Sequence, residues 1–109
     1  MAAIIVTKNT ELMQRVIDEI KTCFDPEIPV DIWELGLIYE LHLDDENHLK
    51  IVMTLTSPNC PVAESLPAEV ENKLKLVQGI ATAELKLTFE PPWEKEMMSE
   101  VAQLELGFM

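Results

Sequence analysis

The chain is poor in cysteine and in positive charge. It has two cysteines, and its eight lysines and arginines face 20 acidic residues, so the net charge is −12 at pH 7. Two cysteines without zinc-finger spacing cannot build a disulfide framework, so we expect a reducing, cytoplasmic setting. The excess of acid excludes nucleic acid and anionic membrane surfaces as expected partners, because both attract basic proteins.

Long apolar runs and low-complexity tracts are also missing. The start, MAAIIVTKNTELM, has too short an apolar run for a secretory signal, and no stretch approaches the roughly 20 residues of a membrane-spanning helix. The hydrophobic fraction of 48% is typical of a globular chain rather than a disordered one. With 109 residues and no linker or repeat, the sequence predicts a single domain over residues 1–109.

Hydrophobic periodicity predicts helices and strands in alternation. Helical spacing covers residues 10–23, with Asn9 or Thr10 as the cap, and residues 62–77, followed by Gly79. Pro67 leaves two versions of the second helix open: a kinked helix from Pro61, which we favour, or one that begins near Pro67. A period of two predicts strands over residues 37–43, 49–56 and 81–89.

The resulting order is α-β-β-α-β, an α+β fold. We predict a two-layer sandwich with a three-stranded mixed sheet, both helices on one face, and a short C-terminal amphipathic helix. That last helix is predicted from Met97, Val101, Leu104 and Phe108. The order of the strands is left open. A helical crossover makes the third strand parallel to the second, so the irregular stretches 25–36, 56–61 and 90–93 meet at one edge.

This edge gathers residues that the scaffold itself does not need: Asp25, Glu27, Asp31, Cys60, Glu90 and Trp93. Cys60 lies in the stretch LTSPNCPV, where Pro61 suits the first helical position and Cys60 the N-cap. A helix N-terminus stabilises a thiolate, whereas nearby carboxylates oppose it. Cys60 is either a small apolar filler or a functional thiol, and its position favours the thiol. Asn59 tolerates the turn's backbone angles.

Structural roles account for the other candidate residues. Cys23 lies on the apolar stripe of the first helix, where core packing is expected. Asp25 and Asp31 suit helix caps, with Gly36 ending the turn after Asp31, and only the nearness of Asp25 and Glu27 to Cys60 supports a functional role. His42 and His48 are expected to be solvated, far from the edge. A catalytic cysteine normally needs a histidine base, so we expect no enzyme.

Three stretches in combination carry a family resemblance: DPEIPVDIWELGLIYEL, MTLTSPNCPVAE and FEPPWEKEMMSEVAQLELG. They resemble the SufT/PaaD-like family of iron–sulfur (metal–sulfur) cluster assembly factors, over nearly the whole chain. The resemblance implies the same α-β-β-α-β fold. It implies that Cys60, in T-x-P-x-CP, is the reactive cysteine, that Asp25 and Glu27 form the acidic motif, and that Thr54 and Thr56 form the threonine-bearing strand end. Relatives often have glycine at the position of Asn59.

The resemblance also implies a function in cluster assembly or in the maturation of iron–sulfur clients. Such clusters usually have four cysteine ligands, so no stably bound cofactor is expected on one thiol. Cys60 could ligate a transient iron or cluster shared with another molecule, engage a client's nascent site, or shape a docking surface. The implied partners are iron–sulfur assembly proteins or client apoproteins, and a homodimer is left open. The alternative is a small subunit or maturation component of a phenylacetate-type oxygenase complex.

Overall fold

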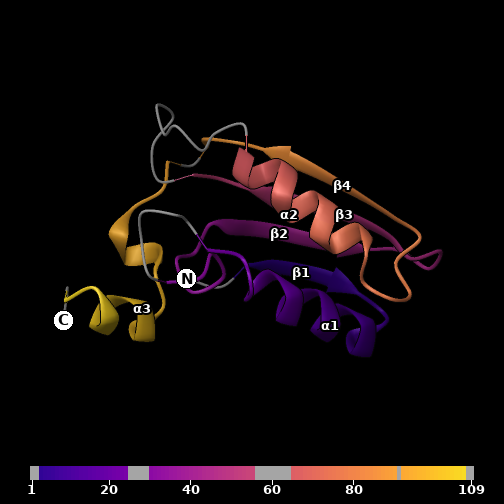
Figure 1. The fold of residues 1–109 in the computed structure, drawn as a ribbon, viewed down its shortest axis with the longest axis horizontal. Helices are drawn as coiled ribbons and strands as arrows, with labels where there is room; N and C mark the ends of the chain where they lie inside the picture. The colour runs from indigo at the N-terminus through magenta and orange to yellow at the C-terminus, as the bar shows by residue number, and fades with distance from the viewer. Residues whose placement is uncertain (1–2, 25–29, 56–64, 91, 108–109) are drawn as a thin grey trace.

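A four-stranded mixed sheet with helices packed on one face forms the body of the protein (Figure 1). The computed structural model describes residues 3–24, 30–55, 65–90 and 92–107. In chain order the elements are β1 (Ile4–Thr7), α1 (Thr10–Ile20), β2 (Ile38–Leu43), β3 (His48–Met53), α2 (Ser65–Lys75), β4 (Thr82–Leu87), a 3₁₀ turn (Lys95–Met97) and α3 (Glu100–Glu105).

The strand order is β1-β2-β3-β4, and the pairings are parallel, antiparallel and parallel in turn. The α+β class, the hairpin and the parallel return of the last strand are therefore confirmed. The prediction of three strands is wrong, because β1 adds a fourth at the edge of the sheet. Its sequence, IIVT, is a short apolar run without alternation, and such a run carries no period from which a strand can be recognised.

The first helix begins at Thr10 as the sequence predicts, but it ends at Ile20 and not at residue 23. Asn9 is its N-cap, and its Oδ1 accepts a hydrogen bond of 3.0 Å from the backbone N–H of Leu12. The buried residues are one helical stripe: Leu12, Met13, Val16, Ile17 and Ile20. Cys23, just beyond the helix, is 1% exposed, which confirms its place in the core.

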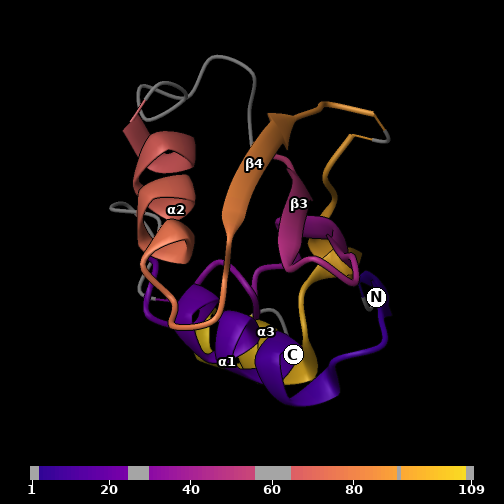
Figure 2. The same cartoon turned by 90° about the vertical axis from the view of Figure 1, so that its right-hand side faces the viewer.

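The sheet has one apolar face and one mixed face. The side chains that point to the helices are buried at alternate positions of the strands: Leu41, Leu43, Leu49, Ile51, Met53 and Ala83. Helices α1 and α2 contact each other, and α2 contacts β4, so the two helices cover the same face (Figure 2). The opposite, open face carries polar and half-exposed residues.

The second helix agrees with both predicted versions over the residues that the structure describes. Pro67 lies in the first turn of α2 as described, and residues 61–64, on which the versions differ, lie outside the described residues. Gly79 adopts a φ of +104° after the helix, as expected of a residue in a left-handed turn. No helix in the described ranges is long and apolar enough to cross a membrane.

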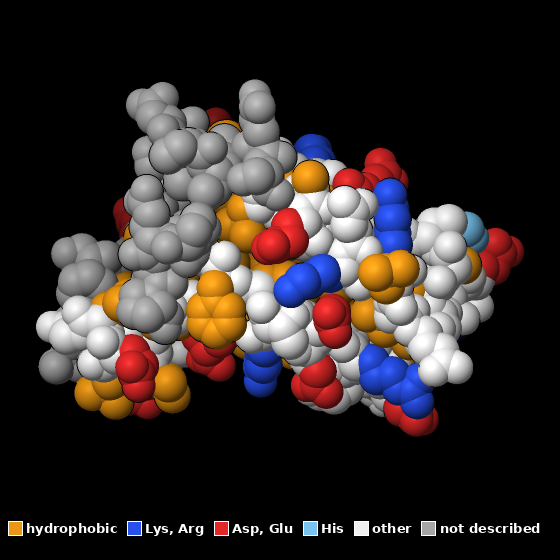
Figure 3. Space-filling view, viewed as in Figure 1, with side chains coloured by type: hydrophobic (Ala, Val, Ile, Leu, Met, Phe, Trp, Pro, Cys, Tyr) orange, Lys and Arg blue, Asp and Glu red, His pale blue; other side chains and the backbone are white. Residues whose placement is uncertain are grey.

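The C-terminal helix is shorter than predicted, and the side that faces the protein is that of Ala102 rather than that of Val101. Ser99 caps α3, with its Oγ accepting from the backbone N–H of Ala102 at 3.1 Å. Met98 and Ala102 are buried, whereas Val101 and Leu104 are 60% and 62% exposed. The predicted stripe through Val101 and Leu104 is therefore wrong, because the cap fixes the helix with Ala102 toward the protein. Figure 3 shows exposed apolar side chains at this end of the molecule.

Candidate functional site

The predicted site divides into a described and an undescribed part. Thr54 and Trp93 are described. The other predicted site residues lie outside the described residues: Asp25, Glu27, Thr56, Asn59 and Cys60. For the undescribed part of the site, the structure shows the residues on either side of segments 25–29 and 56–64. We call these flanking residues the frame of the site.

A series of main-chain hydrogen bonds ties these flanks together. The N–H of Ile32 donates to the carbonyl of Cys23 at 2.9 Å, and the N–H of Leu37 donates to Ile32 at 3.1 Å. The N–H of Thr54 then donates to the carbonyl of Leu37 at 2.8 Å. Phe24 and Asp31 also form an antiparallel bridge. Both ends of segment 25–29 are thus anchored beside the end of β3, from which segment 56–64 departs.

The turn between these anchors is built by Asp31 and Gly36. The Oδ1 atom of Asp31 accepts hydrogen bonds of 3.1 Å from the backbone N–H groups of Trp33 and Glu34, so the predicted capping role of Asp31 is confirmed. Gly36 ends the turn with a φ of +77°, a conformation that favours glycine. The turn places Leu37 directly before β2, and Leu35 is buried in the core.

Trp93 fastens the C-terminal segment to the same turn. Its Nε1 donates a hydrogen bond of 2.8 Å to the carbonyl of Leu35, and its half-buried ring packs on the core. The N–H of Ser99 donates to the carbonyl of Glu34 at 2.8 Å. Among the described residues, the predicted gathering of stretches 30–36 and 90–93 at one edge is therefore confirmed. The contacts that Trp93 makes are structural.

Thr54 is the fully buried polar residue of this edge, and Tyr39 lies close to it. Thr54 is 0% exposed, and its Oγ1 lies 3.4 Å from the carbonyl of Leu55, to which it donates. Burial raises the pKa of the Tyr39 phenol, and a hydrogen bond with the Thr54 side chain partly offsets that shift. The Tyr39 hydroxyl also donates to the Met97 Sδ at 3.5 Å. Tyr39 is thus half-buried where β2 meets the C-terminal segment.

The raised pKa of Tyr39 gives a direct test, because this is the one tyrosine in the chain. Absorbance at 295 nm should show phenolate forming at a higher pH in the folded protein than in urea, where the midpoint should return to about 10. The folded chain holds the phenolic proton more tightly. This contribution to stability is therefore present below the unfolded pKa and is lost as the pH rises through the folded pKa. Identical midpoints with and without urea would contradict the described burial.

Both histidines lie away from the edge with side chains 38% and 45% exposed, which agrees with the prediction that they are solvated. Each also has a polar partner at the surface. His42 Nε2 lies 2.7 Å from Glu40 Oε1, and His48 Nδ1 lies 2.7 Å from Thr82 Oγ1.

Cys23 donates its Sγ–H to the carbonyl of Glu19 at 3.7 Å, and burial raises the pKa of its thiol, which keeps it protonated and unreactive.

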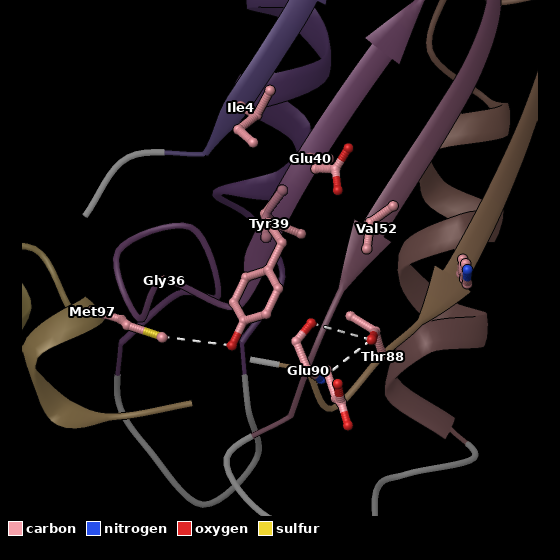
Figure 4. A pocket seen from close by; sticks show the side chains of 10 residues that line it. Ile4, Gly36, Tyr39, Glu40, Val52, Thr88, Glu90 and Met97 are labelled. Atoms are coloured by element: carbon pink, nitrogen blue, oxygen red, sulfur yellow. Dashed lines mark hydrogen bonds between the residues drawn. The ribbon is translucent and has the colours of Figure 1, made fainter. Parts of the chain in front are cut away.

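A pocket on the open face of the sheet was missed by the sequence reasoning (Figure 4). Its volume is about 410 Å³. Strict alternation with Leu41 and Leu43 would put Tyr39 on the helix-covered face, but the register of β2 and β3 shifts between Ile38 and Glu40, and Tyr39 points toward Met97. The residues that line the pocket come from all four strands and the C-terminal segment: Ile4, Gly36, Ile38, Tyr39, Glu40, Val52, Lys86, Thr88, Glu90 and Met97.

The described residues were searched for groups of side chains that could hold a metal ion. In residues 3–24, 30–55, 65–90 and 92–107, no group of three His, Cys, Asp or Glu side chains is placed to hold a metal ion. Any role of Cys60 as a metal ligand therefore stays a prediction.

Comparison with known proteins identifies the class. Residues 13–86 match the family model described as "Iron-sulfur cluster assembly protein". The chain is 43% identical over 104 residues to an Fe-S protein maturation auxiliary factor of Porphyromonas gingivalis, covering 93% of this chain and 99% of the relative. It is 40% identical over 83 residues to the Fe-S protein maturation auxiliary factor SufT of Staphylococcus aureus, covering 76% and 94%.

A solved structure agrees with this assignment. The crystal structure of a domain of unknown function from Bacillus anthracis superposes with a TM-score of 0.84 at 34% identity, covering 92% of this chain and 95% of that one. The chain therefore belongs to the iron–sulfur cluster assembly protein family. Its resemblance to SufT-like members, which the motifs around Asp25, Leu35 and Cys60 predicted, is confirmed.

Proposed function

We propose that this protein is a non-catalytic accessory factor in the assembly or maturation of iron–sulfur proteins, and that it acts by contact with assembly proteins or client apoproteins. The names of the relatives from Porphyromonas gingivalis and Staphylococcus aureus support this role. Cys60 is proposed as the functional thiol at the contact, with Asp25 and Glu27 beside it. Iron or a cluster would be cargo held transiently rather than a resident cofactor.

The observation that carries the site is the main-chain series from Cys23 through Ile32 and Leu37 to Thr54. Segments 25–29 and 56–64 are far apart in sequence, yet their flanking residues are joined through three hydrogen bonds. This supports the proposal, because the residues that precede the acidic motif and the cysteine motif belong to one hydrogen-bonded frame. Functional groups on loops held by a rigid frame are the common arrangement of binding sites.

The Cys60→Ala variant tests this function. It should leave the fold unchanged and lower the activity of iron–sulfur client enzymes several-fold in cells that depend on this protein, because only the thiol is removed. The matched control is Cys23→Ala, in the core, which should lower stability but spare client maturation wherever the protein remains folded. The readout is client enzyme activity together with client iron content. Full client loading in the Cys60→Ala strain would contradict the proposed role of the thiol.

A further inference from the structure

The pocket on the open face is a trough that crosses the sheet from edge to edge. The register places Ile4 beside Glu40, Glu40 beside Val52, and Val52 beside Lys86. One row of side chains, one from each strand, therefore runs across the floor, and it alternates between apolar and charged residues. Figure 4 shows Ile4, Glu40 and Val52 projecting from their strands on this face.

The surface continues into a second hollow at the β1 end. This hollow has a volume of about 260 Å³ and shares Gly36, Ile38 and Met97 with the trough. It adds the side chains of Trp33 and Glu34. Both volumes together describe a continuous, partly apolar surface at the junction of the sheet with the C-terminal segment, in the size range of ligand-binding sites, about 300–1,000 Å³.

The charge of this surface is unbalanced. Glu34, Glu40 and Glu90 line the two hollows, whereas Lys86 supplies their one described ammonium group. The whole chain carries a net charge of −12, so the surrounding field has the same sign as the local excess. A surface that combines apolar side chains with an excess of carboxylates is complementary to a ligand with apolar and cationic groups.

We propose that this trough binds an extended segment of a partner protein that presents an apolar, a basic and an apolar side chain at every second position, and therefore on one face. Strands lie about 4.8 Å apart, so a row over four strands spans about 14 Å, which four or five residues of extended chain cover. The two apolar side chains on that face would contact Ile4 and Val52, and the lysine or arginine between them would face Glu40. The proposal rests on the proposed accessory function only in assigning the segment to an assembly or client protein.

The test is a titration of the full chain with two synthetic peptides, acetyl-LSKSV-amide and acetyl-LSESV-amide, followed by ¹H–¹⁵N NMR; in each, residues 1, 3 and 5 share one face. The basic peptide should shift the amide signals of the trough residues Ile4, Glu40, Val52 and Thr88, and should bind more weakly as salt is raised. The acidic peptide should bind at least about tenfold more weakly, because its carboxylate would face the carboxylate of Glu40.

Variants on one face of the sheet provide the matched controls. Glu40→Gln should weaken the basic peptide by about 3- to 10-fold, and Val52→Lys by more than about tenfold, since it adds a like charge to the floor. Glu84→Gln makes the same chemical change on the open-face side of β4 but outside the trough, and should change affinity less than about twofold. Unchanged thermal melting would show that each variant is folded.

Three results would overturn the proposal: equal binding of the two peptides, equal weakening by Glu40→Gln and Glu84→Gln, or signal shifts confined to the exposed Val101 and Leu104 of α3. Cys60→Ala should leave peptide affinity unchanged. Failure of the peptide titration and failure of the client-maturation test are therefore separate outcomes.

Discussion

Gly36→Ala should lower the free energy of unfolding by about 3 kcal/mol. Gly36 has a φ of +77°, which costs a residue with a Cβ about 1 kcal/mol. The larger cause is space, because a Cβ on Gly36 would lie 2.3 Å from the carbonyl oxygen and 2.9 Å from the carbonyl carbon of Met97. Both are backbone atoms, and neighbouring hydrogen bonds from Met97 to Glu94 and from Ser99 to Glu34 oppose their displacement.

Gly107→Ala is the matched control for this prediction. Gly107 has nearly the same φ, +76°, but nothing lies within 4 Å of the Cβ that alanine would add. Its substitution should cost only about 1 kcal/mol, the conformational part alone. Urea unfolding followed by circular dichroism measures both variants. Losses of equal size would show that the close approach of Gly36 and Met97 does not limit the fold.

Trp93→Ala should destabilise the protein by about 2–3 kcal/mol, the second largest effect that we expect. The indole is half-buried against the core, and its Nε1 donates to the carbonyl of Leu35 at 2.8 Å. Removal of the ring leaves a cavity and exposes the turn that Gly36 ends. The C-terminal segment would also lose its side-chain attachment to the turn, so the variant should be more susceptible to proteolysis beyond Glu90.

Trp93→Phe separates the two contributions of the indole. It keeps most of the apolar contact but removes the N–H donor, so it should cost about 1 kcal/mol. Urea unfolding of the two variants side by side gives the comparison. If the phenylalanine variant were as unstable as the alanine variant, the hydrogen bond rather than the packing would dominate. If it matched the wild type, the bond to Leu35 would contribute nothing.

Several elements were predictable because many residues repeat the same signal. The five buried residues of α1 fall on one stripe, and Asn9 precedes them as a cap. The hairpin of β2 and β3 alternates over two strands of six residues each, which fixes both the strands and their apolar face. By contrast, β1 has four residues, is parallel to β2, and is joined to it across α1. The sequence IIVT has no local pattern that indicates its pairing with β2.

The frame of the site was partly predictable for a similar reason. Asp31 and Gly36 have local chemistry, a cap and a left-handed turn end, and both were recognised. The position of Tyr39 was not, because one irregularity in the β2–β3 register moves it out of the alternating pattern. The pocket was missed altogether, since it requires four strands to be placed side by side before Ile4 and Lys86 can line one surface.

The hydrogen bonds that join Cys23, Ile32, Leu37 and Thr54 have a consequence for how this protein tolerates change. All three connect main-chain atoms, so the spacing of these four residues is set by the peptide backbone and not by any side chain. Apolar substitutions at Ile32 or Leu37 would alter the packing beneath without changing that spacing. Related sequences can therefore exchange one apolar residue for another of similar volume at the buried positions Ile32 and Leu37, provided that proline, which has no N–H to donate, never replaces Ile32, Leu37 or Thr54.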